Sequence, residues 1–194
     1  MAHLTRDDLY SLEQYATERQ AMRERVMRHK QARRVDLGDA VSLYFEDKLT
    51  MQYQIQEMLR VERIFEPDAI QEELDAYNPL IPDGQNWKAT MMIQIEDVEA
   101  RRKALARMQG IEDAIWIRVG DHDPVTPIAD EDLERDSEEK TSSVHFLRFE
   151  LTPEMASAAK AGEPIQLGVD HPEYKAETGP LPDATRASLV EDLD

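Results

Sequence analysis

The sequence predicts an α+β fold in which an N-terminal helical lobe with a short hairpin precedes a ferredoxin-like βαββαβ antiparallel sheet. The first observation is the helical spacing of apolar residues over much of residues 1–80. The second is the order β-α-β-β-α-β over residues 86–171, which is that of a split βαβ unit. The third is the turn-rich connector PLIPDGQN between these two parts. We expect one compact unit overall, with residues 172–194 as a flexible acidic tail.

The N-terminal lobe is expected to begin with a helix and to continue into a hairpin. Thr5 is the predicted N-cap and Asp8 its reciprocal partner, and the helical spacing extends to about Lys30. Beyond this helix, the segment RRVDLGDAVSLYFED predicts two short strands joined by a turn at Gly38.

Residues 48–65 fit two secondary structures. Apolar residues alternate with polar ones over residues 48–56, as they would in a strand. The high content of Met, Gln, Leu, Glu and Arg instead favours a helix, which Asp47 can cap. Pro67 is well placed to begin a second helix. We therefore expect two helices here, with a strand over residues 48–56 as the alternative.

The third of the four strands after the connector, TSSVHFLRFEL at residues 141–151, has two different faces. His145 and Phe149 point one way, while Phe146 and Arg148 point the other. In a ferredoxin-like unit this strand is central in the sheet, so both of its faces are expected to be covered. A single bulge would exchange the two faces, which leaves open the side on which each polar side chain lies.

A polar pocket is predicted between the sheet and the helices over residues 48–77. The strand faces opposite the apolar ones are too apolar for plain solvent surface and too polar for plain core. Such a pocket suits a small anionic or amide-bearing ligand, and the alternative is a structural ion-pair network that joins the two parts. The candidate pocket residues are Lys88, Thr90, Trp116, Arg118, Arg148, Glu57, Arg60 and Glu73.

The histidines indicate a second candidate site. His145 and His171 share one end of the predicted sheet, and the acidic loop before residue 141 arrives at the same end. Two histidines and a carboxylate are a known ligand set for non-haem iron and zinc. A hydrogen-bonded core histidine is the alternative, because the chain has no HExxH or Glu-x-x-His spacing. The candidate metal ligands are His145, His171, Asp170 and Glu138.

Composition excludes several classes of function. The chain of 194 residues has no cysteine, which excludes disulfides, thiolate nucleophiles and cysteine-ligated iron–sulfur clusters. Its net charge of −18 opposes nucleic-acid binding, and its apolar runs are too short to span a membrane. The N-terminus has no signal-peptide pattern, which predicts a cytoplasmic location. A basic run from Arg19 to Arg34 is expected to be a solvated helix face or a docking surface for an acidic partner.

Four segments resemble an uncharacterised bacterial family known only as a domain of unknown function. They are LYFEDKLTMQYQIQEMLRVERIFE, NPLIPDGQNWKAT, EEKTSSVHFLRFEL and GVDHPEY, and the resemblance extends over residues 1–174. Genes of this family often neighbour those of rubrerythrin-like proteins and of iron–sulfur oxidoreductases of the heterodisulfide-reductase type. The resemblance therefore implies a role in a redox or oxidative-stress system with these proteins as partners, and it supplies no catalytic residues.

We therefore expect a cytoplasmic accessory or binding protein of a bacterial redox system, which acts by docking to partners and through the polar pocket. The alternative is a metal-dependent enzyme that uses iron or zinc bound by His145, His171 and a nearby carboxylate such as Asp170 or Glu138.

Overall fold

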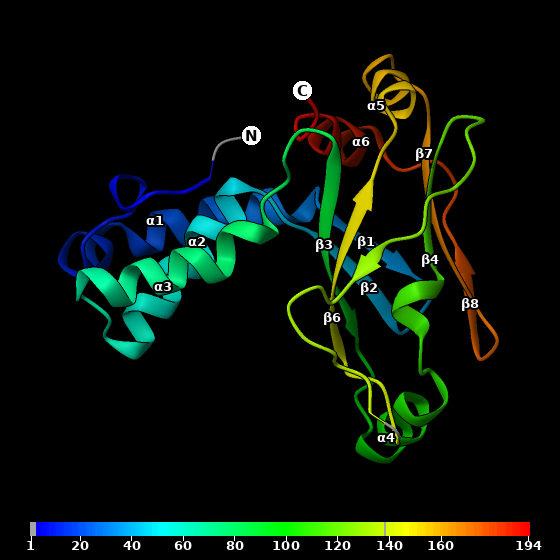
Figure 1. Ribbon diagram of the computed structural model, residues 1–194, viewed down its shortest axis with the longest axis horizontal. Helices are drawn as coiled ribbons and strands as arrows, with labels where there is room; N and C mark the ends of the chain where they lie inside the picture. The colour runs from blue at the N-terminus through cyan, green and yellow to red at the C-terminus, as the bar shows by residue number, and fades with distance from the viewer. Residues whose placement is uncertain (1–2, 138) are drawn as a thin grey trace.

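A computed structural model describes residues 3–137 and 139–194 of the chain (Figure 1). The α-helices are α1 (Leu12–Gln31), α2 (Lys48–Glu62), α3 (Pro67–Tyr77), α4 (Val98–Arg107), α5 (Pro153–Lys160) and α6 (Asp183–Val190). The strands are β1 (Arg34–Leu37), β2 (Val41–Phe45), β3 (Asn86–Ile93), β4 (Ile115–Val119), β5 (Ile128–Ala129), β6 (Val144–Glu150), β7 (Ile165–His171) and β8 (Tyr174–Glu177). Short 3-10 helices are η1 (Arg6–Asp8), η2 (Asn78–Leu80) and η3 (Ile111–Ala114).

The fold is α+β, as the sequence predicts, but its strands form two antiparallel sheets. One sheet has the strand order β1-β2-β3-β6-β5, and the other has the order β4-β7-β8. A ferredoxin-like unit would join β3, β4, β6 and β7 in one sheet, and this arrangement is not observed. The reason lies at the strand edges. The hairpin strand β2 pairs with β3, and β5 pairs with β6, so neither edge of the β3–β6 pair is open to β4 or β7.

The apolar face of each strand points into one shared core. Along β6 the buried residues are His145, Leu147 and Phe149, so the alternation expected for this strand is confirmed without a bulge. Trp87 and Met91 of β3 and Ile117 of β4 belong to the same buried cluster. The apolar faces of the two sheets therefore cover each other.

The helices α1, α2 and α3 form an arm beside the sheets (Figure 1). They pack on one another around two small apolar clusters of their own. Helix α2 is confirmed over residues 48–62, and its predicted cap Asp47 accepts a hydrogen bond from the Thr50 backbone N–H at 2.9 Å. Pro67 begins α3 as expected. Among the described residues, no helix is long and apolar enough to cross a membrane.

The start of the first helix differs from the prediction. Thr5 and Asp8 do bond to each other, at 2.8 Å from the Thr5 backbone N–H to the Asp8 carboxylate, but they bracket only η1. Leu9 then has an extended backbone, which ends that turn. Helix α1 begins at Leu12, where Ser11 and Gln14 form a second capping box.

Strand β8 and helix α6 lie in residues 172–194, for which the sequence predicts a flexible tail. Leu181, Leu189 and Leu193 are buried in the main core. Arg33 is 1% exposed, and its guanidinium donates to the Asp192 carboxylate at 2.5 Å. The Trp87 indole N–H donates to the Leu189 carbonyl at 2.8 Å. Three spaced leucines and a buried ion pair thus hold the C-terminal segment against β1–β3.

This buried ion pair predicts a specific pH dependence. Burial raises the pKa of Asp192 from 3.8 to about 6, outweighing the attraction of Arg33. The folded state then holds a proton that the unfolded state has lost, so this contribution is full below about pH 4 and disappears as the pH rises through 6. Asp192→Asn should flatten the pH dependence of the free energy of unfolding between these values by at most about 3 kcal/mol, measured by urea denaturation.

The matched control for this measurement is Asp170→Asn, because Asp170 is exposed on β7 and pairs with the exposed Lys175. Its pH profile should follow that of the unmodified protein. Equal profiles for Asp192→Asn and the unmodified protein would show that Asp192 does not titrate in this range.

Candidate metal centre

The centre of the candidate site is His145, whose side chain is fully buried on the core face of β6. It lies opposite Met91 of β3, at the end of the strand nearest the loop that precedes β6. The neighbouring core positions on the strand, Leu147 and Phe149, are apolar. An imidazole in such a place needs a partner for each ring nitrogen, because an unsatisfied buried polar group is costly.

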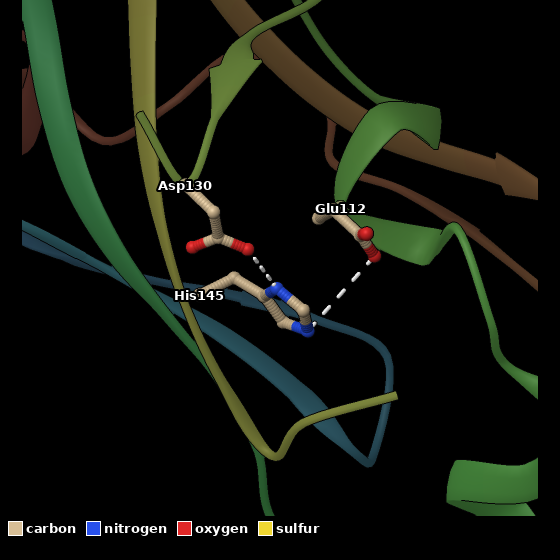
Figure 2. Close-up of side chains that lie close together, drawn as sticks. All are labelled: Glu112, Asp130 and His145. Carbon is tan, nitrogen blue, oxygen red and sulfur yellow. Dashed lines mark hydrogen bonds and ion pairs between the residues drawn. The ribbon is translucent and has the colours of Figure 1, made fainter. Parts of the chain in front are cut away.

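Asp130 holds the first ring nitrogen. Its carboxylate Oδ2 lies 2.5 Å from His145 Nδ1, and Figure 2 shows the two side chains end to end. The other oxygen accepts the Phe146 backbone N–H at 2.9 Å and the Arg135 guanidinium at 3.0 Å. Asp130 directly follows β5 and has a left-handed backbone with φ of 49°, which Asp tolerates better than most residues. Strand β5 therefore places this carboxylate beside β6.

The second ring nitrogen faces a group of oxygen atoms. Nε2 lies 2.8 Å from the Thr141 hydroxyl and 3.1 Å from the Ser142 carbonyl. Two carboxylate oxygens, one from Glu112 and one from Asp136, each lie 3.9 Å from the same nitrogen. The Glu112 carboxylate faces this end of the ring in Figure 2. Three carboxylates thus surround one imidazole, two of them at Nε2.

Glu112 is the unusual member of this group. It lies in η3 and is 8% exposed, and its Oε2 has no hydrogen-bond partner among the described residues. Burial raises the pKa of Glu112 above its ordinary value of 4.5. Gly110, with φ of 77°, makes the turn that begins η3. The Gly110 N–H donates to the second oxygen of Asp136 at 3.0 Å, which ties the two carboxylate-bearing segments together.

The groups around the two ring nitrogens of His145 act mainly as hydrogen-bond acceptors. The Thr141 hydroxyl donates to Asp136 at 2.5 Å, so toward Nε2 its oxygen acts as an acceptor. The Ser142 carbonyl and the Asp130 carboxylate also only accept. Oxygen atoms thus surround both ring nitrogens, and carboxylates of Glu112, Asp130 and Asp136 lie within 4 Å of them. A dication bound at Nε2 would take the place of the proton on that nitrogen.

Glu112, Asp130 and His145 form a buried group that could hold a metal ion. One ligand atom from each of the three lies within 4.8 Å of the others. Only His145 of this set is among the ligands predicted from the sequence. The alternation of β6 is the signal for His145, whereas Glu112 and Asp136 come from irregular segments without a recognisable ligand spacing.

The other predicted ligands lie elsewhere. His171 is buried at the end of β7, and both of its ring nitrogens bond to backbone, Nε2 to the Gln109 carbonyl at 2.9 Å and Nδ1 to the Glu173 N–H at 3.2 Å. Asp170 points to the opposite, exposed face and pairs with Lys175 at 2.7 Å. Glu138 lies outside the described residues. The two histidines expected to share a metal ion are thus separately engaged.

The predicted pocket residues are also divided. Lys88 and Arg148 line one cavity between α3 and the outer face of β3 and β6. Thr90 is buried and donates to Glu46 at 2.8 Å, so it does not reach that cavity. Glu57 binds Arg19 and Tyr15 inside the helical arm. Arg60 and Glu73 lie on α2 and α3, outside the lining of the cavity.

Trp116 and Arg118 belong to β4 and therefore to the other sheet. The Trp116 ring packs on Gly168 of β7 so closely that a Cβ at that glycine would lie 2.2 Å from the ring. The Arg118 guanidinium lies over the Trp116 ring and donates to Gln166 at 2.5 Å. These contacts stabilise the pairing of β4 with β7, and they give both residues a structural role.

Comparisons with known proteins identify relatives without an assigned activity. The model of a family described as "Protein of unknown function (DUF3501)" matches residues 3–193, which extends beyond the 1–174 expected from the resemblance. A crystal structure of a novel protein of unknown function from Burkholderia pseudomallei K96243 is similar over 100% of both chains, with 53% sequence identity and a TM-score of 0.94. No curated protein matches the chain.

The unpartnered carboxylate of Glu112 predicts a gain in stability on its removal. In protein stripped of metal with chelator, Glu112→Gln should raise the free energy of unfolding by about 1 kcal/mol or more, because a buried carboxyl group whose Oε2 has no hydrogen-bond partner among the described residues is replaced by a neutral amide. Denaturant unfolding measures the change. Glu99→Gln, at an exposed position on α4, is the control and should change little. A less stable Glu112→Gln protein would contradict the assignment of Oε2 as an unsatisfied atom.

Proposed function

The chain belongs to this family of proteins of unknown function, and we propose that it binds one divalent transition-metal ion at His145, Glu112 and Asp136. The observation that carries the proposal is the Glu112 carboxylate, which is buried, faces His145 Nε2 at 3.9 Å and has an oxygen without a hydrogen-bond partner among the described residues. Natural proteins seldom bury a carboxylate oxygen without a partner. A bound cation would supply that partner.

The charges of the site support a dication. Glu112, Asp130 and Asp136 carry three negative charges when ionised, and Arg135 pairs with Asp130 at 3.0 Å. Because Arg135 also binds Asp132, at 2.6 Å, a dication on a neutral imidazole would offset most of the remaining negative charge. Asp130 would not bind the metal itself in this arrangement. It would hold Nδ1, fix the ring tautomer and leave Nε2 as the ligand atom, as carboxylates behind metal-binding histidines usually do.

The donor atoms indicate the class of metal. One imidazole nitrogen, two carboxylates and the neutral Thr141 hydroxyl suit zinc, ferrous iron or manganese, and the absence of sulfur disfavours copper(I). Ligand atoms on one zinc ion lie about 3.3–3.5 Å apart, given metal–ligand distances of about 2.0–2.2 Å. The two separations at Nε2 are 3.9 Å, so binding requires the Glu112 and Asp136 carboxylates to move toward Nε2 and toward each other.

The burial of His145 favours a binding protein over a metal-dependent enzyme. Catalytic metal sites keep a coordination position open to substrate, while structural and storage sites are closed. His145 has no exposed surface, and the side chains of Glu112 and Asp136 are 11% and 22% exposed. The proposal therefore joins an accessory role to a bound metal. The rubrerythrin-like and iron–sulfur partners and the cytoplasmic location remain predictions that rest on the family resemblance and on the N-terminal sequence.

Metal titration of untagged, chelator-treated protein tests the proposal. We expect one equivalent of Zn²⁺ or Mn²⁺, or of Fe²⁺ under anaerobic conditions, to bind in calorimetry and to raise the midpoint of thermal unfolding. His145→Gln, Glu112→Gln and Asp136→Asn should each weaken binding at least about tenfold, because each removes one ligand.

The matched controls are His171→Gln and Asp170→Asn, which change the ligands predicted from sequence that the structure places elsewhere. Both should bind metal like the unmodified protein. Absence of binding by all three metals, or loss of binding only in the two controls, would refute the site.

A further inference from the structure

The cavity lined by Lys88 and Arg148 lies on the face of β6 opposite His145. It has a volume of about 430 Å³ and separates the end of α3 and η2 from the outer face of β3 and β6. This volume is in the range of small-molecule sites. Six of its lining residues are apolar or aromatic, and the other five are charged. The first group is Ala76, Tyr77, Pro79, Leu80, Phe146 and Leu147, and the second is Asp75, Lys88, Glu131, Asp132 and Arg148.

Lys88 is the polar group at this cavity whose charge is least compensated. Its side chain is half-buried, and its ammonium donates to the Pro79 carbonyl at 2.5 Å. Among the described residues, no carboxylate oxygen lies within 4.0 Å of that nitrogen to form an ion pair. Burial lowers the pKa of Lys88, and this effect is larger than the opposing influence of Asp83, Glu131 and Glu150. The ammonium is thus half-buried with carboxylates acting on it only from beyond contact distance, which leaves its charge incompletely compensated.

The acidic residues near the cavity are already paired. Glu131 binds the Arg148 guanidinium through both oxygens at 2.7 and 2.8 Å, and Arg148 also donates to Glu150. Asp132 binds Arg135, which lowers the pKa of Asp132 to about 2. Asp75 is exposed at the rim and accepts from the Gln71 amide. The Lys88 ammonium is thus the charged group lining the cavity that has no oppositely charged group in contact with it among the described residues.

We propose that this cavity binds a small free carboxylate with an apolar body, with the carboxylate on the Lys88 ammonium. The body would lie on Tyr77, Leu80 and Phe146, which close the cavity on the helix and sheet sides. Arg148 would shape the wall without contacting the anion, because its donors are held by Glu131 and Glu150. The cavity lies on the other side of the strand from the proposed metal centre, since Phe146 and Arg148 point away from the face that carries His145.

Hexanoate and benzoate are the probes, and hexanamide and benzyl alcohol are their neutral counterparts. Titration followed by backbone amide NMR shifts should show saturable binding of both acids, with a Kd on the order of 1 mM and shifts centred on α3, β3 and β6. The neutral compounds should bind at least about tenfold more weakly, because they cannot pair with the ammonium.

Lys88→Gln should lose at least about tenfold in affinity for both acids, while the exposed control Lys175→Gln should lose nothing. Ala76→Trp, which fills the cavity and keeps Lys88, should abolish binding and decides the matter if Lys88→Gln does not fold. Binding that survives both substitutions in folded protein, equal affinity for the neutral compounds, or no saturation by either acid up to about 30 mM would overturn the proposal.

Discussion

The need to satisfy a buried imidazole constrains the whole region between β4 and β6. His145 sits on a sheet face that otherwise carries leucine and phenylalanine, and it is fully enclosed. Each polar contact of its ring comes from a segment that has little regular structure of its own. Asp130 ends the two-residue strand β5, and Thr141 and Ser142 precede β6. The conformation of this loop is thus set by hydrogen bonds to one ring more than by apolar burial.

Two left-handed backbone positions make this arrangement possible. Gly110 turns the chain from α4 into η3, and its N–H then holds Asp136. Asp130 has a left-handed backbone where β5 ends, and it reaches both His145 and the β6 backbone. Glu112 is the member of the group that remains without a full set of partners. An unpartnered buried oxygen of this kind is uncommon in folded proteins, and the metal proposal rests on it.

Strand β6 separates two environments of opposite character. Its inner face carries His145 among carboxylates, and its outer face carries Phe146 and Arg148 at the cavity that Lys88 also lines. The strand is paired on both edges, with β3 along its length and with β5 at Leu147 and Arg148. Arg33, which precedes β1, and Trp87, which belongs to β3, both bond to the C-terminal segment. These bonds hold α6 against the end of the core. The proposed metal centre and the proposed ligand cavity thus lie on opposite faces of one strand.

The local patterns in the sequence determined the secondary structure and the inward direction of His145. Alternation placed β3, β4, β6 and β7, the cap Asp47 and the residue Pro67 placed α2 and α3, and the parity of β6 put His145 and Arg148 on opposite faces. These features depend on neighbours a few residues apart. Tertiary structure alone decided which strands pair, because β2 and β5 compete for the edges of β3 and β6. It also decided which residues surround His145, since Glu112, Asp130 and Asp136 approach its ring only after distant segments have folded together.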